Sequence, residues 1–280
     1  MEKQTFRQFS IAAHGRVVEY HRPAVMGILN ITADSFYDGG RYSSDEAMVR
    51  RARQLVDDGA DIIDIGASSS RPGAVLLTPE AEAERLCHAV GLVRMELPGT
   101  VISVDTCYSL PARAAVAAGA DMVNDIGGGQ LDAEMFDTVA ELQVPYLMMH
   151  MRGTPQTMQQ MTGYDDIVGD LARYFSERLD RLYRLGVKDV WLDPGFGFAK
   201  TIDENHELLR RIGELTALFR EPMVAALSRK SMIYKKLGTT PEASLEGTVA
   251  LNALALDRGC RVVRVHDPRP ALETIKLIYE

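Results

Sequence analysis

The fold of this protein is decided by a stretch that recurs along the chain, first as Asp58-Gly59-Ala60-Asp61-Ile62-Ile63-Asp64-Ile65-Gly66. The same arrangement returns in residues 118–127, 185–193 and 258–267. In each copy an amphipathic stretch ends at a glycine, and after a short connection an apolar run finishes in polar residues. Glycine suits the left-handed position that closes a helix, and an unbroken apolar run suits a strand covered on both faces. The repeat therefore predicts alternating helices and parallel strands.

The remaining sequence continues this alternation. Eight strands are predicted, over residues 24–32, 61–67, 101–106, 122–126, 144–151, 190–193, 223–228 and 262–267. Between them apolar residues recur at i, i+4, i+7 and i+8, for example from Met48, which is typical of helices that cover a sheet. These units predict an α/β fold, a single-domain TIM (β/α)8 barrel over residues 1–280, with a short hairpin at residues 9–20 covering its lower end. The periodicity alone also allows a doubly wound sheet, but the G-x-G-x-x-G signature of nucleotide binding is missing after the first strand.

Composition narrows the class of protein. Hydrophobic residues make up 46% and charged residues 25% of 280 residues, as in globular proteins with a sizeable core. A net charge of −8 argues against a general nucleic-acid binder, and the longest apolar runs are too short to span a bilayer. The three scattered cysteines form no disulfide framework, and the sequence opens on no secretory signal. We therefore expect a protein of the reducing cytoplasm that binds neither nucleic acid nor membrane.

Polar residues follow the predicted strands, where the reactive groups of a TIM barrel lie. The strand ends carry Asn30 with Asp34, Ser70 with Arg71, Asp105, Asn124, His150, Asp193, Ser228 to Lys230, and Arg264 with His266. A single polar residue after a strand is more often a turn or a helix cap. Their convergence on one rim favours a functional site.

The first chemical group at this rim consists of two carboxylates, one amide and one ammonium: Asp105, Asn124, Asp193 and Lys230. Such a set can satisfy a flat heterocycle that carries both donors and acceptors, because carboxylates accept from ring N–H groups while amide and ammonium donate. A buried Asp–Lys ion pair with a purely structural role is the alternative interpretation.

The second group consists of donors suited to an anion: Arg71, Arg264 and His266. The amide oxygen of Asn30 could join oxygens of that anion around a hard cation such as Mg²⁺. Asn30 could equally stabilise its own loop. Further along, Ser228-Arg229-Lys230-Ser231 leads directly into a helix predicted over residues 232–237, whose free N–H groups favour a carboxylate or a phosphate. Two long glycine-rich loops, residues 32–41 and 67–74, are typical of lids.

These motifs, in this order, resemble the dihydropteroate synthase family from about residue 24 to the end of the chain. The matching stretches are residues 26–36, 70–74, 102–106, 123–125, 149–155, 192–198, 227–231 and 263–267. The chain departs from the family at Ala33, where proline is usual, and at Ser68, where an acid is usual. Arg152 replaces a usual lysine, and Ala199 a usual glycine.

The resemblance implies a transferase of folate biosynthesis that condenses (7,8-dihydropterin-6-yl)methyl diphosphate with 4-aminobenzoate. It implies catalytic roles for Asp34, Asp105 and Lys230. The pterin would bind Asp105, Asn124, Asp193 and Lys230. The diphosphate would meet Asn30, through Mg²⁺ as cofactor, together with Ser70, Arg71, Arg264 and His266. The 4-aminobenzoate would lie near Phe36, Arg71, Pro72, Phe198 and Ser231, where sulfonamides should compete. Family members are commonly homodimers, so a homodimer is expected.

Two other functions are considered. A folate-binding methyl-transfer module has the same barrel and a similar pterin pocket, but it needs neither a diphosphate site nor the Ser-Arg-Lys-Ser segment. A non-catalytic homologue would bind pterin without turnover, and the acid missing at Ser68 would agree with it. Diphosphate release that depends on both 4-aminobenzoate and Mg²⁺ would separate the three.

Overall fold

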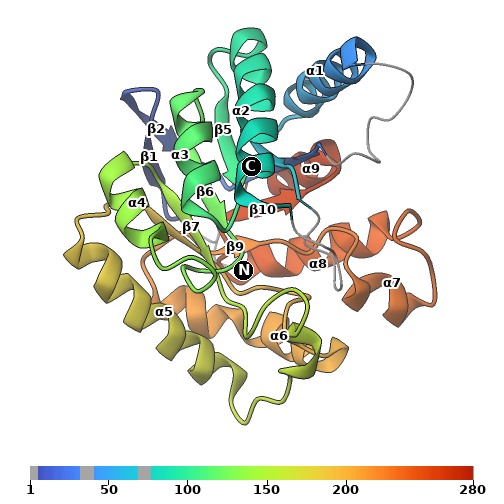
Figure 1. The fold of residues 1–280 in the computed structure, drawn as a ribbon. Coiled ribbons are helices and arrows are strands. Elements are labelled where there is room, and N and C mark those ends of the chain that lie inside the picture. The colour runs from blue at the N-terminus through green and yellow to red at the C-terminus, as the bar shows by residue number, and fades with distance from the viewer. Residues whose placement is uncertain (1–5, 32–40, 69–76, 280) are drawn as a thin grey trace.

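The computed structural model describes residues 6–31, 41–68 and 77–279 (Figure 1). Eight parallel strands form its central sheet in the order β8-β7-β6-β5-β4-β3-β10-β9. Their bounds are β3 Ala24–Asn30, β4 Ile62–Gly66, β5 Val101–Asp105, β6 Met122–Asp125, β7 Tyr146–Met149, β8 Val190–Asp193, β9 Val224–Ala225 and β10 Val262–Val265. A parallel bridge between Leu192 and Met223 brings the two ends of this sheet together. The predicted TIM barrel is confirmed.

Helices surround the strands (Figure 1). Their bounds are α1 Arg41–Asp57, α2 Pro79–Glu96, α3 Ser109–Ala117, α4 Met135–Leu142, α5 Ile167–Arg184, α6 Ile202–Leu218, α7 Ser231–Leu237, α8 Leu245–Asp257 and α9 Pro268–Tyr279, with a short 3-10 helix, η2, at Met158–Gln160. Thr78 caps α2 by accepting from the backbone N–H of Ala81, and Pro79 opens that helix.

The repeated glycines perform the same task in all four copies of the motif. Gly59, Gly119, Gly186 and Gly259 have φ between 87° and 113°. Only glycine occupies this region without steric strain, and each of them reverses the chain between a helix and the following strand. The interpretation of the repeat as a helix–strand unit is therefore confirmed.

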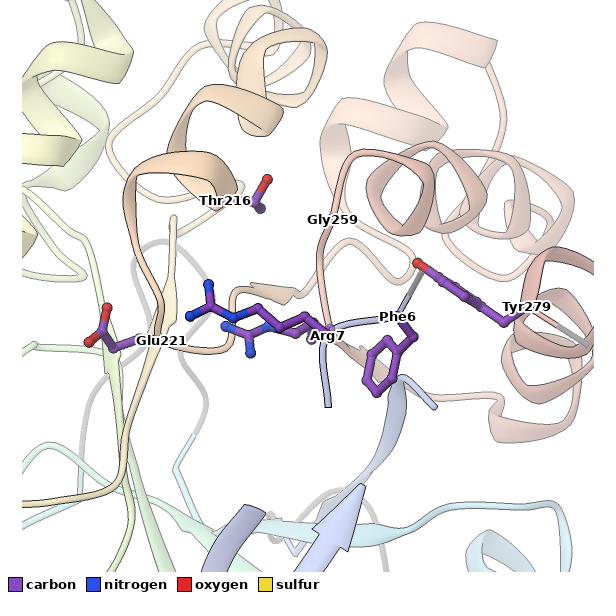
Figure 2. Close-up of a pocket in the computed structure, with 7 residues that line it drawn as sticks. Phe6, Arg7, Thr216, Glu221, Gly259 and Tyr279 are labelled. Carbon is purple, nitrogen blue, oxygen red and sulfur yellow. The ribbon is translucent and has the colours of Figure 1, made fainter. Parts of the chain in front are cut away.

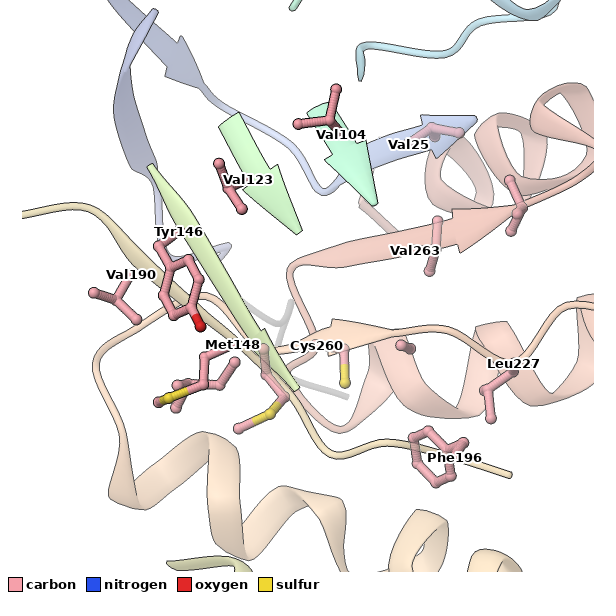
Figure 3. Packing of buried hydrophobic residues seen from close by; sticks show 14 of the residues in the cluster. Val25, Val104, Val123, Tyr146, Met148, Val190, Phe196, Leu227, Cys260 and Val263 are labelled. Carbon is pink, nitrogen blue, oxygen red and sulfur yellow. The ribbon is translucent and has the colours of Figure 1, made fainter. Parts of the chain in front are cut away.

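Two layers of apolar side chains hold the barrel together. Outward-facing residues, among them Val25, Val104 and Val263, pack between the strands and the helices (Figure 3). Inward-facing residues such as Met26 and Trp191 fill the lower half of the barrel. An antiparallel hairpin, β1 Phe9–Ala13 and β2 Arg16–Tyr20, closes that lower end by placing Ile11 and Tyr20 against the inward-facing residues. The hairpin is thus found where it was expected.

Because the lower half is packed, the barrel opens at the carboxyl ends of its strands. All strands of the barrel are parallel, so their ends meet on this one side. No helix among the residues that the structure describes is long and apolar enough to cross a membrane.

Candidate active site

Four neighbouring strands bring their last residues to one level. The register pairs Asn30 with Gly66, Gly66 with Asp105, and Asp105 with Asn124. Gly66 has no side chain in this row, and a Cβ there would lie 3.4 Å from the Asp105 Cβ and 3.7 Å from the Asn30 Oδ1. The row thus places an amide, a space, a carboxylate and a second amide side by side at the mouth of the barrel.

Arg264 joins two carboxylates at this mouth. Its Nε and Nη2 each lie 2.7 Å from Oδ2 of Asp64, and Nη2 lies 2.8 Å from Oδ2 of Asp105. Asn124 donates to the same Asp64 oxygen at 3.0 Å. Burial is the main cause that raises the pKa of Asp105 to about 7, against the attraction of Arg264. The neighbouring carboxylates of Asp64 and Asp105 raise the pKa of Arg264, so its guanidinium stays charged.

Asp64 belongs to the hydrogen-bond network at this mouth, and the sequence analysis missed it. Its side chain is completely buried, and Oδ1 has no hydrogen-bond partner among the described residues. The alternation of side chains along a strand could have identified it. Asp64 lies two residues from Gly66 in β4 and therefore faces the barrel interior with it. The apolar run around Asp64 hides this signal, because the same run also fits a strand of the repeat.

Asp193 and Lys230 face each other without forming an ion pair. Asp193 is 3% exposed and accepts from the Gly195 N–H at 2.7 Å. Lys230 donates to the Phe196 carbonyl, and its Nζ lies 4.7 Å from the centre of the Phe198 ring. Among described residues no carboxylate lies within 4.0 Å of its ammonium. The structural ion pair considered from the sequence is therefore not formed, and both groups can take a ligand.

Burial acts on this pair in opposite senses. It raises the pKa of Asp193, although the charge of Lys230 opposes that shift. It lowers the pKa of Lys230 to about 8, although Asp193 opposes that shift in turn. Since each charge is held in a poorly solvated place, a ligand that satisfies either one gains more than it would in water.

His266 is a neutral donor at this rim. Burial and the charge of Arg264 lower its pKa to about 4. Ser228 Oγ accepts from the His266 backbone N–H at 3.2 Å and lies 2.9 Å from its Nδ1. The Ser228 hydroxyl is therefore free to donate to Nδ1, which leaves the proton of the ring on Nε2.

Arg229 turns away from the mouth despite its place between Ser228 and Lys230. Its backbone has a φ of 56°, and its guanidinium binds the carboxylate of Asp267 at 2.9 Å. It also donates to the carbonyl of Glu242 at 2.9 Å. This reversal places the next residue, Lys230, at the mouth and lets α7 begin at Ser231 as the predicted segment required.

Part of the predicted site lies outside the described residues: Asp34, Phe36, Ser70, Arg71 and Pro72. The structure brings the others together on one side of the barrel as the ends of strands or the loops after them. Asn30 is exposed, Phe198 is 8% exposed and Ser231 is half-buried.

The donor set around Asn30 fits a loosely held Mg²⁺. The Gly66 gap lies between its Oδ1 and Oδ2 of Asp105, 3.7 and 3.8 Å from the position of an added Cβ. No cluster of three or more His, Cys, Asp or Glu side chains suited to a metal occurs among the residues described. Mg²⁺ usually keeps several waters and shares a few protein oxygens with substrate phosphates, so one amide oxygen at an open mouth is a sufficient protein contribution.

A second buried group missed by the sequence analysis lies behind the mouth. Lys200, 3% exposed, has its Nζ 3.1 Å from Nδ1 of His150. It also donates at 3.1 Å to the carbonyls of Gly195 and Phe198. The contacts join the ends of β7 and β8 behind the residues that contact Lys230.

Two cavities at the opposite end of the barrel are separate from this site. One of about 130 Å³ lies between residues 6–7 and α9 and is lined by Arg7, Glu221 and Arg261 among others (Figure 2). The other, of about 230 Å³, also adjoins Arg7 and Arg261. Neither includes a residue of the rim.

Comparison with known proteins agrees with this geometry. The Pterin binding enzyme family matches residues 26–266. The dihydropteroate synthase of Synechocystis sp. is 42% identical over 259 residues, which cover 91% of this chain and 89% of the relative. That of Escherichia coli is 37% identical over 272 residues, or 95% of this chain and 94% of the relative.

Solved structures give the same result. The Xanthomonas albilineans dihydropteroate synthase with 4-aminobenzoic acid has a TM-score of 0.88 at 37% identity, covering 96% of both chains. The same enzyme in complex with 7,8-dihydropteroate has a TM-score of 0.85 at 35% identity, covering 96% of this chain and 97% of that one. By sequence and by fold, then, the chain belongs to the family of pterin binding enzymes, and its resemblance to the dihydropteroate synthases is confirmed.

Proposed function

We propose that this protein condenses (7,8-dihydropterin-6-yl)methyl diphosphate with 4-aminobenzoate, forming 7,8-dihydropteroate and diphosphate in folate biosynthesis. The observation that carries the proposal is the gathering of Asp105, Asn124, Asp193, Lys230 and Arg264 at one mouth, in a chain 42% identical to the dihydropteroate synthase of Synechocystis sp.. Related structures hold 4-aminobenzoic acid or 7,8-dihydropteroate, one substrate and the product of this reaction.

The floor of the mouth suits the pterin ring. The carboxylates of Asp105 and Asp193 accept from the ring N–H and amino groups, and Asn124 and Lys230 donate to its carbonyl and nitrogen atoms. Both carboxylates are held in place by N–H donors, Asp105 by Arg264 and Asp193 by Gly195. A ring that enters therefore meets groups that need little rearrangement.

The chemistry is a substitution at the methylene carbon of the pterin. The C–O bond to diphosphate breaks first, because the electron-rich ring stabilises the cation that remains, and the carboxylate of Asp105 adds to that stabilisation. The amine of 4-aminobenzoate then forms the C–N bond and releases one proton. Its lone pair is nucleophilic at neutral pH, so neither a strong base nor a covalent enzyme intermediate is needed.

The departing diphosphate meets neutral and cationic donors. His266 offers its Nε2–H without adding charge, and Arg264 supplies a permanent positive charge that Asp64 and Asp105 already share. Asn30 would hold Mg²⁺ through its amide oxygen, and that ion would neutralise negative charge on the leaving group. Ser70 and Arg71 are proposed to bind the diphosphate as well. Asp34 is proposed to stabilise the positive charge that develops on the pterin.

The 4-aminobenzoate would bind above the pterin, between Phe198 and Ser231. The Phe198 ring packs against the Lys230 ammonium, 4.7 Å from its centre, so this lysine borders both substrates. Phe36, Arg71 and Pro72 belong to the same proposed subsite. Because a sulfonamide complex is known for the Yersinia pestis enzyme, 34% identical to this chain, we propose that sulfonamides compete for this subsite.

A homodimer in the reducing cytoplasm is proposed as well. Helix α8 is apolar over much of its length: it buries Thr248 and Asn252, packs the half-buried Leu254 against the core, and leaves Ala250 exposed. The mass measured by light scattering after gel filtration would test the dimer. The free thiols of Cys87, Cys107 and Cys260 agree with a reducing compartment.

The decisive experiment is a turnover assay with the purified protein. Diphosphate release should require the pterin diphosphate, 4-aminobenzoate and Mg²⁺ together, and mass spectrometry should find 7,8-dihydropteroate. Pterin binding without turnover would instead identify a non-catalytic homologue. Methyl transfer from a folate to a corrinoid would identify the methyl-transfer module.

A further inference from the structure

The buried pair of Lys200 and His150 has no part in the chemistry described above. Lys200 is 3% exposed and His150 is 2% exposed. The ammonium of Lys200 uses its three donor directions on Nδ1 of His150 and on the carbonyls of Gly195 and Phe198, each at 3.1 Å. No carboxylate of the described residues lies within 4.0 Å of it. A buried ammonium without a counter-ion is unfavourable for stability, so its three contacts call for an explanation.

These contacts anchor both ends of one loop. The loop, residues 194–199, follows β8 and carries three groups that contact the site on its other side. The Gly195 N–H holds Asp193. The Phe196 carbonyl accepts from Lys230, and the Phe198 ring packs against the same ammonium. The carbonyls of Gly195 and Phe198 are therefore bound to Lys200, while other groups of the same loop contact Asp193 and Lys230.

The loop needs such an anchor because its backbone is tight. Gly195 and Gly197 have φ of 70° and 83°, and Ala199 has a φ of 49°, which is unfavourable for a residue with a Cβ. A Cβ added to Gly195 would lie 2.0 Å from the His150 carbonyl oxygen. A conformation of this kind persists only where surrounding contacts determine it.

The protonation of the pair suits a permanent anchor. Burial, with the nearby charges of Lys200 and Arg152, lowers the pKa of His150 well below its usual range, so the neutral ring can accept through Nδ1. Burial also lowers the pKa of Lys200 to about 7, while Asp193 and Glu204 oppose the shift and Lys230 and Arg152 add to it. Even the neutral amine keeps two N–H donors for the two carbonyls and can accept from the other tautomer of His150.

We infer that Lys200, oriented by His150, is a positioning residue that fixes the loop of residues 194–199 and thereby holds the Lys230 ammonium at the pterin site. The inference rests on the proposed function of that site. Losing the anchor should weaken pterin binding before it affects the attack by the amine, because Lys230 and Asp193 bind the ring in the ground state.

The experiment compares variants matched in shape. Calorimetry with (7,8-dihydropterin-6-yl)methyl diphosphate and Mg²⁺ measures the dissociation constant of the pterin. Lys200→Met removes every donor from a chain of similar length and should raise that constant about ten-fold, the effect of one charge-assisted hydrogen bond. Lys276→Met, an exposed lysine of α9, is the control and should leave it unchanged.

Two variants of His150 keep the test decisive if Lys200→Met does not fold. His150→Phe keeps a ring without an acceptor and should weaken pterin binding several-fold. His150→Asn, whose Oδ1 can replace Nδ1 as the acceptor, should restore affinity to within about two-fold of the wild type. A role confined to packing would give the opposite order, because phenylalanine fills the space better than asparagine.

Unchanged pterin affinity in folded Lys200→Met and His150→Phe variants, with only a lower melting temperature, would overturn the inference. So would equal losses in His150→Phe and His150→Asn. If the wild type itself binds no pterin, the proposed function fails instead, and the two failures are thus distinguished by the first titration.

Discussion

Asp64 and Arg264 are 200 residues apart in the sequence, yet Nε of the arginine lies 2.7 Å from Oδ2 of the aspartate inside the barrel. The same aspartate oxygen accepts from Asn124, and the same guanidinium binds Asp105. One completely buried carboxylate therefore orients a residue of the proposed pterin subsite and a cation of the proposed diphosphate subsite together. Residues that share such a network are expected to act as a unit.

Asp64→Asn should lower kcat/KM for the pterin diphosphate by about ten- to a hundred-fold, because Arg264 exchanges an ion pair with a carboxylate for a hydrogen bond to an uncharged amide. Asp61→Asn is a matched control, since Asp61 pairs with Arg22 at 2.8 Å just before the same strand begins. That variant should lose stability and keep its kinetic constants. Steady-state rates and thermal melting measure both, and equal rates for the two variants would refute the role of Asp64.

Variants of the pterin subsite and of the 4-aminobenzoate subsite should each affect the binding of a different substrate. Asp193→Ala should weaken pterin binding, because it removes an acceptor of ring N–H groups and leaves the Lys230 charge uncompensated. Ser231→Ala should mainly raise the KM for 4-aminobenzoate and leave pterin affinity unchanged. Calorimetry and initial rates measure the two effects. A loss in Ser231→Ala confined to pterin binding would contradict the assignment of that residue.

Pterin affinity should fall at both low and high pH, which gives its pH profile an acidic limb and an alkaline limb. Burial raises the pKa of Asp105 to about 7, so its carboxylate is lost as the pH falls below that value. Burial lowers the pKa of Lys230 to about 8, so its ammonium is lost as the pH rises above that value. Binding should therefore be strongest between about 7 and 8. Calorimetry with the pterin alcohol, which carries no titrating diphosphate, tests this.

A variant separates the two limbs. Lys230→Arg should move the alkaline limb upward, because a guanidinium stays charged throughout this range. The acidic limb should remain in place. Affinity that is constant from pH 6 to 9 in the wild type would show that neither group sets the binding of the ring.

Removal of the metal tests the proposed role of Asn30 as a ligand of Mg²⁺. A chelator should abolish turnover, and Asn30→Ala should raise the Mg²⁺ concentration needed for half-maximal rate, because one of the few protein oxygens offered to the ion is lost. Affinity for the pterin alcohol should stay the same in this variant. Full activity in the presence of the chelator would exclude the metal from the reaction.

Much of this protein follows from local sequence alone. The glycine that ends a helix and the apolar run after it determine four of the eight units of the barrel, because both signals are local in the sequence. The strand ends likewise predict which polar residues share a mouth, since parallel strands end on the same side. The order of the motifs along the chain identifies the family.

Only the tertiary structure decided how the charges at that mouth are connected. Asp64 lies within an apolar run and Lys200 follows a loop, so neither position distinguishes a functional residue from a structural one. Their partners, Arg264 and His150, lie 200 and 50 residues away in the sequence, and Lys230 and Phe196 are 34 residues apart. Closure of the barrel sets these contacts, because strand register and loop conformation together determine which side chains meet in its interior.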